Sequence, residues 1–374
     1  MNRKQFLILV IAFVVLGGAG LALFWQDIAA YRTAGAKIGA KLLPGFNMGE
    51  VAQIRLQDAK SEVTLVRKDT SWRVRERSDY PANVQSIGDL LTKLSELKVV
   101  QSESVGVSLL PRLDLAAPGK GEGAGTLVEF KDAAGKTTGS LLLGKKILKK
   151  DPMNPLPNAQ DGVPAGRYVM VAGAQDTVIV VSDPLEGAEA RPGAWLARHF
   201  FKADRVKTLT VAGDGAMQWK ITRDLEYGQW KFAAGGGELD PSAAVAAINA
   251  LGGMSFDDVI PDPQPAAADK AVTVTAETFD NLTYQLKISM RPTGDGYAVS
   301  FSVSGEPAKQ RVPEKGEKPE DQARNDKDFA QSLGALQVRI AREKALSQWA
   351  YRVPAKMLAP VLKDRAQLVA AKRR

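Results

Sequence analysis

Two stretches of this sequence, TSWRVRERSDYPANVQSIGDLL (Thr70–Leu91) and YGQWKFAAGGGELDPSAAVAAINAL (Tyr227–Leu251), present the same features in the same order. Each places a tryptophan in a short segment of alternating apolar and polar residues, which is typical of a half-buried strand. A turn and a proline follow, and apolar residues then recur every three or four positions, which indicates a helix with one buried stripe. This recurrence predicts that the chain contains one structural unit twice.

The segments before each tryptophan also match. The alternating segment VKTLTV at residues 206–211 corresponds to VAQIRL at 51–56, an offset of 155 residues (206 − 51). Trp230 corresponds to Trp72 at 158 (230 − 72), and Pro241 to Pro81 at 160 (241 − 81). MQWKITR at residues 217–223 also corresponds to VTLVRKD at 63–69, so four matched elements at a nearly constant offset indicate a duplication.

The correspondence continues along the chain. The sequence predicts two long hairpins, GTLVEFKDAAGKTTGSLLLGK and AVTVTAETFDNLTYQLKISM. Each is followed by a predicted strand with a tyrosine at its start, Tyr168 in the first case and Tyr297 in the second. Trp195 and Trp349 then match at an offset of 154 (349 − 195). We therefore predict an α+β fold in which two tandem modules, residues 45–202 and 203–370, each contain an antiparallel or mixed sheet and one packing helix.

A long helix predicted at about residues 328–347 has no counterpart in the first module. Its apolar register is formed by Phe329, Leu333, Leu336, Ile340 and Leu346. An inserted helix on one copy is a natural place for a partner or for packing between domains.

The N-terminal segment differs from the rest. FLILVIAFVVLGGAGLALFW at residues 6–25 holds no charge, and twenty helical residues span roughly 30 Å, the thickness of a bilayer's hydrocarbon core. We predict a cytoplasmic tip and transmembrane anchor over 1–30 and a tether over 31–44. A cleaved signal peptide ending at Ala30 is the alternative. Because long folded domains translocate largely regardless of flanking charge, we expect the N-terminus in the cytoplasm, the bulk in the periplasm or outside, and the inner membrane as the location.

Composition excludes several classes of function. The 374 residues are 45% hydrophobic and 25% charged, as in a globular protein, and they include no cysteine, which excludes disulfides, thiolate nucleophiles and cysteine metal sites. The net charge of +8 is spread along the chain without a recognition motif, so we expect no nucleic-acid partner.

Two motifs suggest chemistry but fit structural roles better. Gly135, Lys136 and Thr137 spell the end of a phosphate-binding loop, but Phe130 stands where that motif needs a glycine, so we expect a hairpin turn. His199 is the only histidine, and beside Phe200 it is expected in the core or at a helix end rather than in a catalytic triad.

Carboxylates are the remaining catalytic candidates. Asp257 and Asp258 could act as an acid–base pair. Asp240 before Pro241 is more simply a helix N-cap, and by the offset its matched position holds Tyr80. We therefore expect no catalytic residue, no metal and no cofactor.

Two further groups are candidates for binding. The matched tryptophans Trp72, Trp195, Trp230 and Trp349 could stack on a sugar, but burial against each module's helix is the simpler explanation. The run GKKILKK, with lysines at 145, 146, 149 and 150, could meet anionic headgroups or form a solvated loop.

Several segments together resemble a known family. LLPGFNMGEVAQIRL, SWRV, YPANVQSIGDLLTKLSELKVV, LLGKK, GRYVMVAG and WLARHFFKADRVKTL are similar, in this order, to the uncharacterised family called domain of unknown function 4340. The likeness covers roughly residues 42–260, and QWAYRVPAKMLAPVLKDRAQLV resembles the family's C-terminal end. This chain departs from the pattern in its insertion before Arg167 and in Met170, where relatives tend to carry basic residues.

The resemblance implies a single-span, envelope-facing accessory subunit, often encoded beside an ATP-binding-cassette (ABC) transporter of the gliding-motility type. Its partners would be the permease or an auxiliary membrane subunit, together with the bilayer around residues 6–25. We therefore expect a non-enzymatic accessory or scaffold protein. The alternatives are an envelope protein that binds glycan or lipid in a groove between the modules, and a carboxylate-dependent hydrolase.

Overall fold

The computed structural model describes residues 38–119, 121–149, 162–173, 177–213, 216–261, 271–293, 295–313 and 317–370. The predicted anchor at 6–25 lies outside them. None of the helices in the described ranges combines the length and the apolar character needed to cross a membrane. The chain divides into two compact units, Met1–Leu196 and Ala197–Arg374.

This division lies six residues before the boundary predicted from the repeat (202 against 196). The reason is that the segment after Leu196 packs with the second unit. The ring of Phe200 lies 5.1 Å from that of Phe256 and 4.6 Å from that of Tyr351.

The first unit is built on a nine-stranded antiparallel sheet with the order β4-β3-β2-β1-β6-β7-β8-β9-β5. Its strands are β1 (Gln53–Gln57), β2 (Glu62–Lys68), β3 (Ser71–Val74), β4 (Tyr80–Pro81), β5 (Val99–Ser104), β6 (Thr126–Lys131), β7 (Thr137–Lys149), β8 (Val163–Val171) and β9 (Thr177–Val181). The 3-10 helices are η1 (Met48–Glu50), η2 (Arg75–Arg77), η3 (Val107–Leu113) and η4 (Pro192–Trp195).

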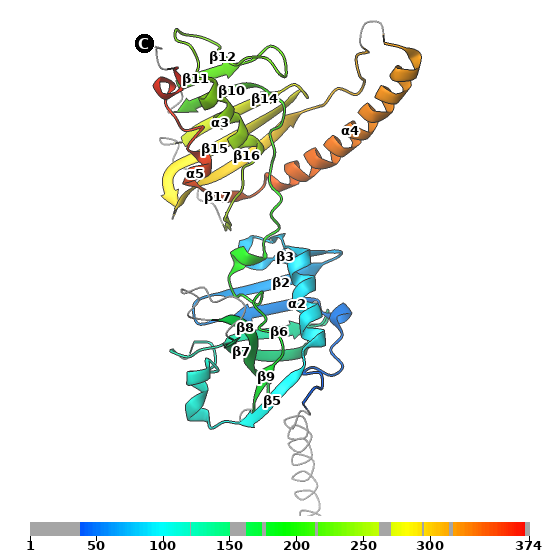
Figure 1. Ribbon diagram of the computed structural model, residues 1–374, viewed down its shortest axis with the longest axis vertical. Helices are drawn as coiled ribbons and strands as arrows, with labels where there is room; N and C mark the ends of the chain where they lie inside the picture. The colour runs from blue at the N-terminus through cyan, green and yellow to red at the C-terminus, as the bar shows by residue number, and fades with distance from the viewer. Residues whose placement is uncertain are drawn as a thin grey trace, which may run out of the picture. The chain divides into compact units, whose positions relative to one another are not determined.

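One helix, α2 (Val84–Glu96), covers the inner face of this sheet (Figure 1). Asn83 caps it, because its side-chain oxygen accepts hydrogen bonds from the backbone N–H groups of Gln85 and Ser86. The stripe that the sequence predicts is buried, at Ile87, Leu90, Leu91 and Leu94. On the strands, Ile54, Leu65, Phe130 and Leu141 are fully buried, and the register places Ile54 opposite both Leu65 and Phe130.

A smaller cluster lies on the other side of the same unit, where η3 covers part of the sheet. Leu110 and Leu115 pack there with Met170 and Val178. The first sheet is therefore apolar on both faces in this region.

The second unit is built on an eight-stranded antiparallel sheet with the order β12-β11-β10-β14-β15-β16-β17-β13. Its strands are β10 (Val206–Gly213), β11 (Ala216–Thr222), β12 (Lys231–Phe232), β13 (Asp258–Ile260), β14 (Ala271–Thr278), β15 (Leu282–Thr293), β16 (Gly296–Gly305) and β17 (Ala350–Pro354). Its helices are α3 (Pro241–Gly252), α4 (Pro319–Leu346), α5 (Ala355–Leu358) and η6 (Arg365–Leu368). With two large antiparallel sheets and few helices, the chain is an α+β protein.

The two sheets have the same strand order when their strands are compared by place along the chain. Strands β1 to β3 correspond to β10 to β12, β5 corresponds to β13, and β6 to β9 correspond to β14 to β17. Helices α2 and α3 also stand at the same point, before the edge strands β5 and β13. Among the described strands, only β4 has no counterpart.

The hydrogen-bond register places Trp72 and Trp230 at equivalent positions. Val74 pairs with Leu65 in the first sheet, Phe232 pairs with Ile221 in the second, and each tryptophan stands two residues earlier.

Two other predicted matches are wrong in register. Tyr297 pairs with Val353 in the second sheet, and the equivalent pair in the first sheet is Arg167 with Val181. The residue equivalent to Tyr297 is therefore Arg167 and not Tyr168. The caps of α2 and α3 are Asn83 and Asp240, so the partner of Asp240 is Asn83 rather than Tyr80.

The match of Trp195 with Trp349 is wrong as well. Trp195 follows β9, whereas Trp349 directly precedes β17. The carbonyl of Trp195 accepts a hydrogen bond from the N–H of the cap Asn83 at 2.7 Å. The carbonyl of Leu368 accepts one from the N–H of the cap Asp240 at 2.9 Å, so Leu368 is the equivalent of Trp195. Loops of unequal length shift the sequence offset without changing the topology.

Candidate functional site

Among the described elements, helix α4 is the largest in the second unit without an equivalent in the first. It lies in the connection between β16 and β17 and extends away from the sheet (Figure 1). It begins at Pro319, earlier than the predicted residue 328. The prediction placed the start too late because the first turns of the helix are polar and carry no apolar stripe. Proline at the first helical position and the acids Glu320 and Asp321 in the first turn favour that start.

Only the C-terminal end of α4 is buried. Its buried residues are Ile340, Glu343 and Leu346, whereas Phe329 and Leu333 on the same stripe are half-buried and Val338 is 70% exposed. A helix gains most of its stability from tertiary packing. Its attachment to the sheet therefore depends on the last two turns.

Glu343 lies at the centre of that attachment, with its side chain 1% exposed. One carboxylate oxygen accepts a hydrogen bond from the hydroxyl of Tyr284 in β15 at 2.9 Å, and the other accepts from the backbone N–H of Lys202 at 3.1 Å. Burial raises the pKa of Glu343, although the hydrogen bond from Tyr284 and the charge of Arg339 oppose that rise. Burial and the nearby carboxylate raise the pKa of Tyr284 in turn.

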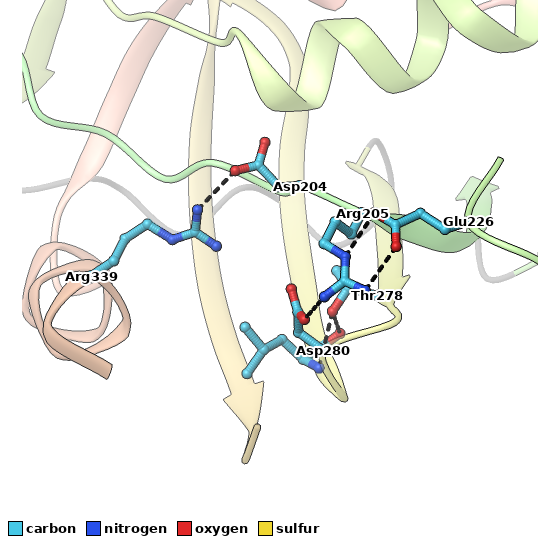
Figure 2. Close-up of polar contacts among 7 residues, drawn as sticks. Asp204, Arg205, Glu226, Thr278, Asp280 and Arg339 are labelled. Atoms are coloured by element: carbon cyan, nitrogen blue, oxygen red, sulfur yellow. Dashed lines mark hydrogen bonds and ion pairs between the residues drawn. The ribbon is translucent and has the colours of Figure 1, made fainter. Parts of the chain in front are cut away.

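Arg339 completes the cluster. Its Nη1 donates to Asp204 Oδ2 at 2.8 Å, and its Nε lies 3.7 Å from Glu343 Oε1 (Figure 2 shows the contact with Asp204). That Nε is buried and makes no hydrogen bond within the described ranges. We call Asp204, Tyr284, Arg339 and Glu343 the α4 clamp.

Arg205, the residue after Asp204, bonds to residues outside the α4 clamp. Arg205 has a left-handed backbone (φ 51°) and donates two hydrogen bonds of 2.8 Å to Glu226, together with one to Asp280 (Figure 2). The hydrogen bond from Arg205 lowers the pKa of Glu226. The entry to β10 is thus tied to α4 through Asp204 and to two turns through Arg205.

The clamp holds three kinds of ionisable group, but its chemistry is that of attachment. Tyr284 is 0% exposed and Glu343 is equally enclosed, so neither can meet a substrate. A buried carboxylate paired with both a phenol and a guanidinium fixes geometry because each group would be costly to bury alone.

Sequence reasoning missed Glu343, although a signal was present. At three- and four-residue spacing, the stripe through Leu336 and Ile340 continues to position 343 and places a charge on the apolar face. Such a charge indicates a buried partner, which could not be identified because Tyr284 is 59 residues away.

The predicted structural roles of two candidates are confirmed. Asp240 caps α3 by accepting from the N–H of Ser242 at 2.8 Å. Gly135 lies in the turn between β6 and β7 with φ 80°, where Asp132 accepts backbone hydrogen bonds from Ala134 and Lys136. The phosphate-loop resemblance is therefore a hairpin turn.

His199 differs from its prediction. It is exposed and lies outside any helix, because the neighbouring Phe200 and Phe201 fill the aromatic cluster. Asp258 lies in β13, where its carboxylate accepts from the N–H of Val259 and stands 3.9 Å from Arg352, while Asp257 precedes the strand. Neighbouring residues in extended chain point to opposite sides, which does not favour an acid–base pair.

The tryptophans have different environments. Trp195 is buried and donates through Nε1 to the carbonyl of Glu189, and Trp72 is 9% exposed. Trp230 is half-buried, with the Arg223 guanidinium 4.8 Å from its ring, and Trp349 is also half-buried. A fifth tryptophan, Trp219, is 2% exposed and donates to the carbonyl of Lys363, a role that the repeat did not indicate.

The lysine run GKKILKK lies in strand rather than in a loop. Lys146 pairs across β7 and β8 with Arg167 and stands 3.6 Å from Glu186. Lys145 and Lys149 are exposed, and Lys150 lies outside the described residues. Strand β7 extends to Lys149, so the described residues of the lysine run belong to the strand that pairs with β8.

Two further features bear on ligands. The described ranges contain no cluster of three or more histidine, aspartate or glutamate side chains that could hold a metal. A cavity of about 460 Å³ lies in the first unit between α2 and the segment before η4, and its lining includes Asp89, Lys93, Leu185 and Glu189.

Comparisons with known protein families, with curated proteins and with solved structures found no significant match to this chain.

Proposed function

We propose that this chain is a membrane-anchored, non-enzymatic accessory protein of an ABC-type transport system, and that α4 is the element it presents to a membrane partner. The chain would be held at the inner membrane by residues 6–25, with both units in the periplasm or outside. The apolar N-terminal segment and the resemblance to domain of unknown function 4340 support this assignment.

The two units are, in this proposal, tandem copies of one module. Their matching strand order, the equivalent helix caps Asn83 and Asp240, and the equivalent Trp72 and Trp230 support a duplication. A duplicated module whose matched residues are helix caps and tryptophans fits a structural role better than a catalytic one.

The observation that carries the proposal is the exposure of α4. No residue from Pro319 to Arg339 is buried, yet the helix is 28 residues long and is secured by a buried charged cluster at its end. A helix with so little packing is marginal by itself in water. Its half-buried stripe, Phe329, Leu333 and Leu336, is the surface to which we assign the partner.

A cysteine crosslinking experiment tests this assignment, because the native chain has no cysteine. We would introduce Ser332→Cys on α4, an exposed position one helical turn from Phe329 and Leu336, and, as a matched control, Val245→Cys on α3, where the valine is 49% exposed. After labelling with a maleimide benzophenone in native membranes, the α4 position should crosslink to a permease or auxiliary subunit and the α3 position should not. Equal products from both positions, or none from α4, would refute the assignment.

The cavity beside α2 favours a second candidate, an envelope protein that binds a polar ligand such as a glycan. Its volume is within the range of small-molecule sites, and Asp89, Lys93 and Glu189 provide opposite charges. Native mass spectrometry of the purified full chain, with Lys93→Glu as the variant, tests this candidate. A bound species that the variant loses would support it.

A further inference from the structure

We propose that β5, the adjoining η3 and the chain start beside them form a surface that lies against anionic lipid headgroups of the anchoring bilayer. This inference rests on the proposed membrane anchor and extends it from residues 6–25 to the folded first unit. We call this surface, with Ile38, Lys41, Lys98, Val100, Val107, Leu109 and Arg112, the β5 face.

The strand β5 is unusual in its packing. It is an edge strand bonded to β9 on one side, and after Val99 none of its residues is buried on either face. Natural edge strands are commonly covered, charged or shortened. The five residues of this edge strand after Val99, with neither face buried, indicate that something outside the unit covers them.

Apolar side chains lie along this edge and its continuation. Val100 is 48% exposed, Val107 in η3 is 66% exposed and Leu109 is 45% exposed. Ile38, at the start of the described chain, is 76% exposed. Single exposed apolar residues are ordinary on a protein surface, but four on adjoining segments point to an interaction site.

The described chain starts at this same edge. The N–H of Gly39 donates to the carbonyl of Val99 at 2.8 Å, and the N–H of Val99 donates to the carbonyl of Ala40 at 3.0 Å. Figure 1 shows the beginning of the described chain beside β5. The twelve residues 26–37 that separate this point from the apolar stretch can span at most about 45 Å.

Charge identifies the partner as anionic. Lys41 and Lys98 stand directly opposite each other in an antiparallel bridge, both exposed, and neither forms an ion pair within the described part of the chain. Like charges in directly opposite positions repel each other unless counter-charge is supplied. Arg112 in η3 is also exposed, and Glu96 and Glu103 are the acids of this stretch.

A lipid surface satisfies these observations together. Headgroup phosphates supply counter-charge for Lys41 and Lys98, and the boundary with the acyl chains accepts valine and leucine side chains. The interface is also wet, so the open backbone edge of β5 keeps hydrogen-bonding partners. An extended peptide added to that edge is the competing occupant.

The test uses the full chain in nanodiscs with a single cysteine at Val107 or Leu109 carrying an NBD fluorophore. Val84→Cys on α2 of the same unit, 58% exposed, is the matched control. Phosphatidylglycerol discs with a headgroup-proximal doxyl lipid should quench both β5-face labels at least twofold and leave the α2 label unchanged. The double variant Lys41→Gln, Lys98→Gln should lose most of this quenching in anionic discs.

The outcomes separate the two proposals. If the chain is incorporated into discs but the β5-face labels are not quenched, the lipid surface is refuted and the anchor stands. If a benzophenone attached at the same cysteines crosslinks to another protein in native membranes, the partner is a peptide and the inference is also wrong. If the chain is not retained in discs, the anchor itself fails.

Discussion

The α4 clamp makes a prediction whose size can be worked out from its contacts. Glu343→Ala removes the acceptor of the Tyr284 hydroxyl and of the Lys202 N–H. The fully buried hydroxyl left without a partner costs about 1–3 kcal/mol, and the partly exposed amide adds about 0.5–1.5 kcal/mol. We therefore expect the second unit to lose about 1.5–4.5 kcal/mol of unfolding free energy, a range that overlaps the cost of breaking buried ion pairs.

Hydrogen exchange read by mass spectrometry gives the measurement with an internal control. Peptides from β15 and β16 report on the clamp, and peptides from β1 and β2 in the first unit should not change. Gln331→Ala, at an exposed position of α4, is the control substitution. A loss below 0.5 kcal/mol, or an equal change in both units, would refute the assignment of Glu343 as the anchor of α4.

A double variant isolates the hydrogen bond from the general effect of truncation. Tyr284→Phe removes the donor without leaving an unpaired hydroxyl. Combined with Glu343→Ala, it should cost clearly less than the sum of the two single changes, because the stranded hydroxyl is absent. Additive losses would show that Tyr284 and Glu343 are not coupled.

Three further predictions follow from single contacts. Because folding raises the pKa of Glu343, the folded state keeps the Glu343 proton at pH values above the unfolded pKa of about 4.3. The free energy of unfolding should therefore fall as pH rises from about 4.3 towards the raised pKa of the folded state. Urea titrations of Glu343→Gln should lack this pH dependence. Asn83→Ala and Asp240→Ala should each cost about 1 kcal/mol in thermal unfolding, since each removes an N-cap from an equivalent helix. Gly296→Ala should destabilise the second unit, because a Cβ would lie 2.2 Å from the Val353 carbonyl oxygen, whereas Gly334→Ala, which meets nothing within 4 Å, should stabilise α4 by about 0.5–1 kcal/mol; circular dichroism melts distinguish the two.

The order of elements could be predicted from the sequence because strand alternation and helix periodicity are local signals. Trp72 and Trp230 were matched correctly because the segments between them and the preceding strands have nearly equal length. Trp195 and Trp349 were matched wrongly because the connections before them differ, and only backbone pairing identifies Leu368 as the equivalent of Trp195. A sequence offset measures loop length as well as homology of position.

The candidate sites could not be predicted for a related reason. Glu343, Tyr284 and Asp204 meet only after the β16–β17 connection returns to the sheet, so their charges have no local explanation in sequence. The exposure of β5 was also hidden, because Val100 and Val107 read as ordinary apolar residues until the sheet order places β5 at an edge.

The distribution of matched and unmatched elements supports a division of roles between core and surface. The inner faces of both sheets use equivalent strands and an equivalent capped helix, which is what a packing requirement preserves. The elements that differ lie elsewhere: η3 beside β5 in the first unit, and α4 with its buried carboxylate in the second. If both copies descend from one module, these additions are where new contacts arose. Crosslinks from α4 and lipid contacts at the β5 face should therefore be lost independently, because they depend on different units.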